Sequence, residues 1–282
     1  MNEKSLGKRL QKARQAAGMT QQQLCSAANL SFSTLTKIER GAIKSPSIFT
    51  VQSIAEALHL SLDELLSGNG KPGRNLRTTK SGVKFIYFDV NGCLVHYYQR
   101  AFATLATKLG VPSDSVETAF WHFNDEVCRG AISMSDFNKA FAKRLGVEEI
   151  DWLNEYLTHV EPVKPMQDLM IEASKHYKIG LLTNIMPFQL SGMRQNGKLP
   201  DLKYDAVVDS SELGMVKPEK AIYEVALERA GVNPEEILLI DDTRANLVAA
   251  EKQGWHVLWF NDARSHESTD HVRNALELNP VV

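Results

Sequence analysis

The chain has 282 residues, a length that accommodates about two domains and excludes a single small module. Its composition, 43% hydrophobic and 23% charged, is ordinary for a globular protein and argues against extensive disorder. The net charge of −2 conceals an asymmetry, because residues 1–80 hold 12 Lys and Arg against 5 Asp and Glu, whereas residues 81–282 hold 20 against 29. A basic arm on an acidic body suggests a nucleic-acid or anion-binding part joined to a part of different function.

The three cysteines, Cys25, Cys93 and Cys128, are odd in number and include no CxxC pair. This usage argues against a disulfide framework and against a zinc site, and it fits a reducing cytoplasm, where we expect the protein to reside. The N-terminal sequence lacks the apolar region of a signal peptide, and no segment approaches the roughly 18 apolar residues of a membrane span. We therefore expect neither export nor membrane insertion.

The first part of the chain, residues 1–66, has apolar residues at helical spacing and no strand-like alternation, which predicts four or five short helices. Thr20 and Gln23 form a capping-box pattern that marks the start of one helix. A tight turn at residues 29–30 separates that helix from a second one, which opens at Ser31. The order is helix, turn, helix.

This order can present the second helix to the major groove of DNA. Residues 20–41, TQQQLCSAANLSFSTLTKIERG, together with flanks from Ser5 to Leu66, resemble the lambda-repressor-like, Cro-type (XRE-like) helix-turn-helix family. The resemblance rests on the TQQQLC start and the IERG end. It implies an all-α DNA-binding domain over residues 1–66 that binds a double-stranded operator as a homodimer. A helix pair used only for protein packing is the alternative.

The resemblance also implies which residues contact DNA. Ser and Thr can bond many bases, Lys can reach guanine, and Phe can contact a thymine methyl group. By match to the family, the residues facing base edges would be Phe32, Ser33, Thr36 and Lys37. Phosphates would be contacted by Gln21 and by the segment that runs from Arg40 to Lys44. Each position could instead be solvated helix surface, and Phe32 could be a core or dimer contact.

Residues 67–81 combine three glycines, a proline and several basic residues with one apolar residue, Leu76. This composition is typical of a flexible basic linker, and it predicts the domain boundary. Basic side chains in the linker could add phosphate contacts, although such a tether is more often merely soluble. They are Lys71, Arg74, Arg77 and Lys80.

The second domain, predicted at residues 82–282, has short apolar runs that alternate with helical stretches. This pattern indicates a doubly wound α/β fold, a parallel sheet with helices on both faces. The runs lie at 84–88, 178–182, 205–208, 236–240 and 255–260. Between the first two runs, four amphipathic segments predict a helical insert over about residues 97–165. They lie at 98–109, 115–128, 134–145 and 149–158.

The insert carries several aromatic residues, which are more often core than substrate-binding surface. They are Tyr97, Tyr98, Trp121, Phe123 and Trp152.

Polar residues follow the predicted strands or lie in the loops after them, at the edge where open α/β sheets bind ligands. They are Asp89 in FIYFDVNGCLV, Thr183 and Asn184 in GLLTN, Lys217 in GMVKPEKAIY, and Asp241 and Asp242 in ILLIDDTRANL. These four motifs, in this order across residues 83–262, resemble the haloacid dehalogenase (HAD) superfamily, specifically its phosphatase-like branch with a helical cap. Any one of them alone would be an ordinary loop sequence.

The resemblance implies a phosphohydrolase chemistry in which Asp89 attacks phosphorus and forms an aspartyl-phosphate. Mg²⁺ requires hard oxygen ligands. The implied ligands are Asp89, the backbone carbonyl of Asn91, Asp242 and, as a further candidate, Asp241. Lys217 would neutralise charge on the nucleophile and the phosphate, and Thr183 and Asn184 would bind phosphoryl oxygens. Asn246 would help to hold the loop of the acidic pair.

Asn91 departs from the family pattern, which is DxDGT or DxDGV where this chain has DVNGC. The second Asp of that pattern is the general acid and base, and an amide cannot carry a proton in this way at neutral pH. Because such assistance contributes about 10² to 10⁴-fold in rate, we expect weak or lost turnover. His96 is a remote candidate for a replacement acid. Cys93 is interpreted as a small packing residue.

Two functions follow from these motifs. The first is a sequence-specific DNA-binding transcriptional regulator whose HAD-like domain binds, or slowly hydrolyses, a phosphorylated small molecule. The alternative is a Mg²⁺-dependent phosphatase with an accessory DNA-binding domain. A nucleic-acid end phosphatase has no support beyond the fusion of the two domains.

Overall fold

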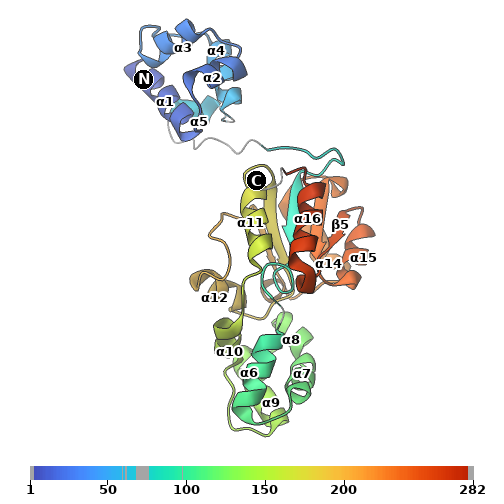
Figure 1. Ribbon diagram of the computed structural model, residues 1–282. Helices are drawn as coiled ribbons and strands as arrows, with labels where there is room; N and C mark the ends of the chain where they lie inside the picture. Colours follow the sequence, from blue (N-terminus) through green and yellow to red (C-terminus); the bar gives the residue numbers. More distant parts are fainter. Residues whose placement is uncertain (1–2, 59, 61, 68–75, 97, 279–282) are drawn as a thin grey trace. The chain divides into compact units, whose positions relative to one another are not determined.

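The computed structural model describes residues 3–58, 60, 62–67, 76–96 and 98–278 (Figure 1). The chain divides into two compact units, Met1–Asn75 and Leu76–Val282. Most of the predicted linker, including Lys71 and Arg74, lies outside the described residues, as does Tyr97.

The end of the predicted linker, residues 76–81, belongs to the second unit. The backbone N–H of Arg77 donates to His176 O at 2.6 Å, and that of Lys80 donates to Glu277 Oε1 at 2.7 Å. Backbone hydrogen bonds to the body restrain this segment, so the second unit begins a few residues before the composition of the sequence indicates.

The first unit is helical, as predicted. Its elements are α1 (Glu3–Ala16), α2 (Gln21–Ala27), α3 (Phe32–Glu39), α4 (Ile48–Ala57) and α5 (Leu62–Ser67). The Thr20–Gln23 capping box is present at the start of α2. Asn29 lies in the turn with a left-handed φ of 51°, and the Ser31 side chain caps α3 by accepting the backbone N–H of Thr34.

A buried ion pair lies beneath the helix-turn-helix. Arg14 Nε donates to Glu39 Oε1 at 2.7 Å, and Gln21 Nε2 donates to Glu39 Oε2 at 2.7 Å. A buried charge needs such partners because its desolvation is costly. The three side chains thereby connect α1, α2 and α3.

The second unit is built on a five-stranded parallel sheet with the order β3-β2-β1-β4-β5. The strands are β1 (Phe85–Phe88), β2 (Lys178–Thr183), β3 (Ala206–Asp209), β4 (Ile237–Asp241) and β5 (His256–Trp259). Each coincides with one of the five apolar runs, which confirms the predicted fold class.

Helices cover both faces of this sheet (Figure 1). On β1, Phe85 and Tyr87 pack in one buried cluster with α14 (Lys220–Ala230) and α15 (Arg244–Glu251). Ile86 and Phe88 face the opposite cluster, which includes α11 (Lys164–Ala173) and α16 (Ser265–Ala275). The alternation explains why the strands read as continuous apolar runs. Two short helices, α12 (Gln189–Gln195) and α13 (Ser210–Leu213), follow β2 and β3.

The insert between β1 and β2 forms a helical cap, as predicted. Its helices are α6 (Gln99–Leu109), α7 (Ser113–Trp121), α8 (Asn124–Cys128), α9 (Met134–Leu145) and α10 (Trp152–His159). Phe120 and Trp152 are fully buried at its centre, with their ring centroids 4.8 Å apart. Within the described part of the chain, no helix has the length and apolar character needed to cross a membrane.

Candidate active site

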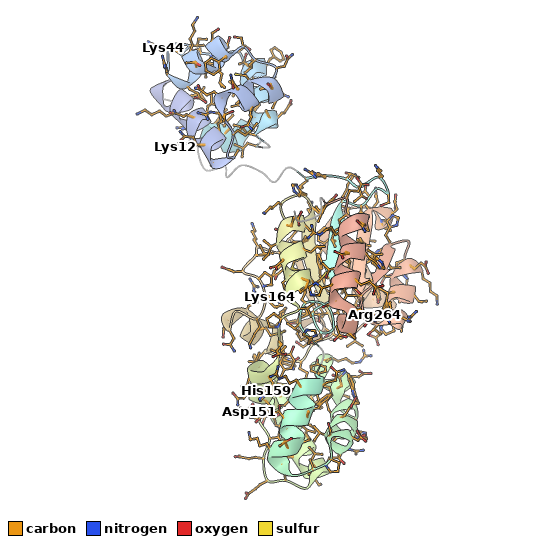
Figure 2. All side chains as sticks on the ribbon, viewed as in Figure 1. Lys12, Lys44, Asp151, His159, Lys164 and Arg264 are labelled. Atoms are coloured by element: carbon orange, nitrogen blue, oxygen red, sulfur yellow. The ribbon has the colours of Figure 1, made fainter. Side chains whose placement is uncertain are left out.

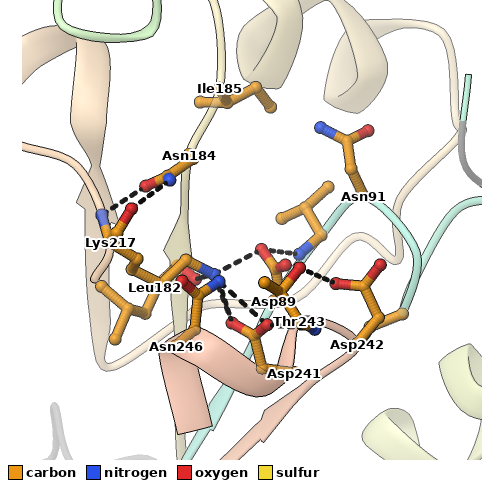
Figure 3. A network of polar contacts seen from close by, with 12 residues as sticks. Asp89, Asn91, Leu182, Asn184, Ile185, Lys217, Asp241, Asp242, Thr243 and Asn246 are labelled. Carbon is orange, nitrogen blue, oxygen red and sulfur yellow. Dashed lines mark hydrogen bonds and ion pairs between the residues drawn. The ribbon is translucent and has the colours of Figure 1, made fainter. Parts of the chain in front are cut away.

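The ends of three neighbouring strands bring predicted catalytic and metal-binding residues together (Figure 3). Asp89 directly follows β1, Asp241 ends β4 and Thr183 ends β2. All three residues are buried, with at most 6% of their surface exposed. Residues about 150 positions apart in sequence thus meet at the carboxyl edge of one sheet, where such folds bind ligands.

Lys217 lies at the centre of this group. Its Nζ donates to Asp241 Oδ2 at 2.6 Å and to Leu182 O at 2.9 Å, and it lies 2.9 Å from Asp89 Oδ1. Burial alone would lower the pKa of Lys217, but the charges of Asp241 and Asp89 raise it above its ordinary value. The ammonium therefore remains charged next to the proposed nucleophile.

Asp241 has both carboxylate oxygens occupied by protein groups. Oδ1 accepts the Thr243 backbone N–H at 2.8 Å and Asn246 Nδ2 at 3.0 Å, while Oδ2 accepts Lys217 Nζ. Asn246 therefore holds the acidic loop as the sequence predicted. These contacts make Asp241 a positioning residue for Lys217 more than an open metal ligand.

Asp89 and Asp242 offer the free oxygens. Asp89 Oδ1 accepts the Val90 N–H at 2.7 Å and contacts Lys217, whereas Oδ2 has no hydrogen bond within the described chain. Asp242 accepts the Thr243 hydroxyl, at 3.1 Å, through Oδ1, and no other side chain among the described residues donates to it. Oxygens of Asp89, Asp241 and Asp242 lie within 4.8 Å of one another. Such hard donors fit Mg²⁺.

The electrostatics of this pair also fit a cation. Burial raises the pKa of Asp89 to about 7 and that of Asp242 to about 6. The charge of Asp241 acts in the same direction on both, and Lys217 opposes it. Two carboxylates that ionise reluctantly become stable in their charged form when a divalent cation binds between them.

Gly92 makes the approach of Asp242 possible. Its φ is +87°, and a Cβ at this position would lie 2.2 Å from Asp242 Oδ2. Any larger residue would push that carboxylate away from the loop after β1, which carries Asp89.

Thr183 and Asn184 differ in their hydrogen bonding. Thr183 Oγ1 is buried and has no hydrogen-bond partner among the described residues, which suits a ligand oxygen. The Asn184 side chain instead binds the backbone of Lys217, donating to its O at 2.8 Å and accepting its N–H at 2.7 Å. Asn184 also lines the pocket, so its proposed phosphate contact would come in addition to this positioning role.

Asn91 points away from the carboxylates (Figure 3). Its Nδ2 donates to Tyr98 OH at 3.0 Å, and its Oδ1 accepts Tyr156 OH at 2.6 Å. Tyr98 precedes α6 and Tyr156 lies on α10, so the amide at the acid/base position is bonded to the cap. The sequence does not show these partners, since only the folded cap brings them to residue 91.

A pocket of about 300 Å³ lies between the strand ends and the cap. The core contributes Asp89, Asn91, Asn184, Lys217, Pro218, Asp242, Thr243, Ala245 and Asn246 to its lining; the cap contributes Tyr98, Trp121, Asn124 and Asp125. Trp152 is core, as expected, but Tyr98 and Trp121 border the pocket. His96 is not among the lining residues, and its Nδ1 lies 3.6 Å from Asp262 Oδ2. Cys93 is fully buried, consistent with a packing role.

In the first unit, Phe32, Ser33, Lys37, Arg40 and Lys44 are exposed, with 52% of the Phe32 surface accessible.

Two other residues of that unit that were predicted to contact DNA, Gln21 and Thr36, are only partly exposed. Thr36 is half-buried with its Oγ1 covered, and the Gln21 amide bonds to Glu39. The exposed side chains are therefore the stronger candidates for DNA contacts.

Comparison with known proteins gives two family matches. Residues 10–65 match the family model described as helix-turn-helix, and residues 83–254, more than half the chain, match that of haloacid dehalogenase-like hydrolases.

Individual relatives resemble the second unit. Acyl-CoA dehydrogenase family member 10 of Mus musculus is 27% identical over 67% of this chain, which spans only 19% of the mouse protein. Glyceraldehyde 3-phosphate phosphatase of Methanothermobacter thermautotrophicus is 26% identical over 71% of this chain and 95% of its own length. A solved structure of a Bacteroides thetaiotaomicron HAD family enzyme, in complex with magnesium and inorganic phosphate, covers 63% of this chain and 94% of that one, with a TM-score of 0.54 and 20% identity.

Proposed function

Because the chain belongs to the haloacid dehalogenase-like hydrolase family, we propose that it is a DNA-binding transcriptional regulator whose second unit binds and slowly hydrolyses a phosphorylated small molecule. The observation that carries this proposal is that the predicted nucleophile Asp89, the buried Lys217 and the acidic pair are all in place, whereas the acid/base position, residue 91, is an amide. Lys217 bridges Asp89 and Asp241, but Asn91 supplies no proton. The relative that acts on glyceraldehyde 3-phosphate supports a small substrate.

In the proposed reaction, one carboxylate oxygen of Asp89 attacks phosphorus while the bond from phosphorus to the substrate oxygen breaks. Lys217 and the hydroxyl of Thr183 stabilise the charge on the transferring group. Mg²⁺, held by Asp89, Asp242 and the Asn91 carbonyl, would supply further charge neutralisation. The leaving oxygen takes its proton from water, because no acid stands at residue 91. Water then attacks the aspartyl-phosphate and gives its own proton to solvent.

A panel of small phosphomonoesters tests the hydrolase part. With Mg²⁺ we expect slow phosphate release, and with excess chelator we expect the rate to fall to background, because Asp89 and Asp242 would repel the substrate without a cation. Release that is unaffected by the chelator would contradict the proposed metal site.

For the first unit we propose binding of double-stranded operator DNA as a homodimer, since helix-turn-helix proteins of this kind dock two-fold on paired half-sites. Lys44→Ala is expected to weaken binding and to reduce the slope of log affinity against log salt by about 1, because one phosphate contact is lost. Lys12→Ala is the matched control, an exposed lysine on α1 at a distance from Lys44 (Figure 2). Fluorescence anisotropy with an operator selected from a random pool measures both.

If the slope of log affinity against log salt is the same for wild type and Lys44→Ala, Lys44 does not contact DNA phosphate. The absence of any sequence-preferring binding would contradict the regulator and would favour the other interpretation of the first unit, a helix pair used only for protein packing. Sedimentation with and without the operator tests the dimer.

A further inference from the structure

Helix α8 forms one wall of the pocket. Asn124 and Asp125, the first two residues of α8, line it together with Trp121 at the end of α7. Asn124 Nδ2 donates to Asp125 Oδ1 at 3.3 Å, and Asp125 Oδ2 has no hydrogen-bond partner among the residues described. The wall thus presents a carboxylate, an amide and one aromatic ring to the organic part of a bound phosphomonoester.

The balance of charge in the pocket is negative. Of the described residues that line it, Asp89, Asp125 and Asp242 are acidic and Lys217 alone is basic. Lys217 is already bonded to Asp89 and Asp241. A bound divalent cation would offset the two core carboxylates but would leave Asp125, on the cap side, uncompensated.

The nearest cation on the same stretch of chain is committed elsewhere. Arg129, the residue after α8, donates from Nη1 to Glu219 Oε2 at 2.8 Å and from Nη2 to Glu219 Oε1 at 2.5 Å. Glu219 follows the Lys217–Pro218 pair in sequence, and its Oε2 also accepts the Val216 N–H at 3.3 Å. A bidentate pair of this kind fixes geometry and occupies the guanidinium.

A close backbone approach fixes the same end of α8. Gly130 has a φ of +67°, and a Cβ there would lie 2.7 Å from Ser211 O. Together with the pair between Arg129 and Glu219, this contact holds α8 against the core, so Asp125 keeps its place at the pocket and Arg129 stays turned toward Glu219.

We propose that α8 restricts the site to phosphomonoesters whose organic part is neutral or cationic, with Asp125 as the specificity-determining residue. The inference rests on the proposed phosphohydrolase function. A second anionic group on the substrate would meet the Asp125 carboxylate with no free cation beside it. Hydroxyl or ammonium groups can donate to Asp125 and Asn124, and carbon-bound hydrogens can lie on Trp121.

Glycerol 3-phosphate and 3-phosphoglycerate test this directly, because they differ by a hydroxymethyl group against a carboxylate. We expect the wild type with Mg²⁺ to favour glycerol 3-phosphate in kcat/KM by about fivefold, the effect of roughly 1 kcal/mol of like-charge repulsion near water. Asp125→Asn should shift the ratio toward 3-phosphoglycerate by about threefold or more. Asp125 and Glu126 are both exposed, but only Asp125 lines the pocket. Glu126→Gln, an equal charge change, is therefore the matched control and should leave the ratio unchanged.

Calorimetric binding of both compounds in the presence of Mg²⁺ separates the two proposals. If neither compound is hydrolysed but glycerol 3-phosphate binds more tightly and Asp125→Asn reduces that preference, the hydrolase function fails and the specificity assignment stands. If both are hydrolysed and Asp125→Asn leaves the ratio at the wild-type value, the role of Asp125 is overturned and the hydrolase function stands. Equal binding of both compounds without turnover contradicts both.

Discussion

Asn91→Asp is expected to raise kcat for small phosphomonoesters by about 10²-fold or more, because it restores an acid and base beside the leaving group. The substitution keeps the side-chain shape. The hydroxyls of Tyr98 and Tyr156, which now contact the amide at 3.0 and 2.6 Å, can both donate to a carboxylate in the same place. The new group therefore needs no repacking of the cap.

The measurement is steady-state phosphate release with Mg²⁺, for wild type and variant at several pH values. Asn124→Asp adds the same charge to another lining position and should give no such gain, because residue 124 is on α8 and not on the nucleophile loop. A rate for Asn91→Asp equal to that of the wild type would show that the amide is not what slows turnover.

Asp89→Asn is expected to lower phosphate release by about 10³-fold or more, since the nucleophile of the first step is lost. The amide also removes one open oxygen from the cation site and one partner from Lys217, which keeps its contact with Asp241. The free energy of unfolding should change much less than the activity. Burial raises the pKa of Asp89 to about 7, so the folded protein loses little when a neutral amide replaces a carboxylate that is costly to keep charged.

Phosphate release by single-turnover kinetics, with thermal unfolding in parallel, separates lost chemistry from lost folding. Asp270→Asn on α16, at a residue that is exposed and does not line the pocket, is the control for loss of one carboxylate. Activity of Asp89→Asn equal to that of the wild type would exclude Asp89 as nucleophile.

Much of the fold could be predicted because its signals are local. The apolar runs that became β1 to β5 are continuous, since helices cover both faces of the sheet. The convergence of Asp89, Thr183 and Asp241 followed from their places at strand ends. The helix-turn-helix was similarly marked by the Thr20 cap and the turn before Ser31.

The remaining features depend on tertiary contacts that no local pattern encodes. Asp241 and Asp242 are adjacent and chemically identical, and only the bonds from Lys217 and Asn246 distinguish the positioning carboxylate from the open one. The cap contributions are equally hidden, because Tyr156 meets Asn91 across 65 residues of sequence. The pair between Arg129 and Glu219 spans 90 residues.

The start of the second unit also depends on contacts that composition does not encode. Residues 77–81 are polar or basic, which is typical of a linker, yet Arg77 and Lys80 bond through their backbones to other residues of the second unit. Backbone hydrogen bonding is independent of side-chain composition, so the sequence carried no sign of it.

The central claim is that Asp89 accepts a phosphoryl group and that Asn91 makes its release slow. The most direct measurement is intact-protein and peptide mass spectrometry after mixing with Mg²⁺ and acetyl phosphate, whose leaving group needs no protonation. We predict a phosphoryl adduct on Asp89 that persists in the wild type, is shorter-lived in Asn91→Asp and is absent from Asp89→Asn. No adduct in the wild type, or an adduct on another residue, would contradict the account.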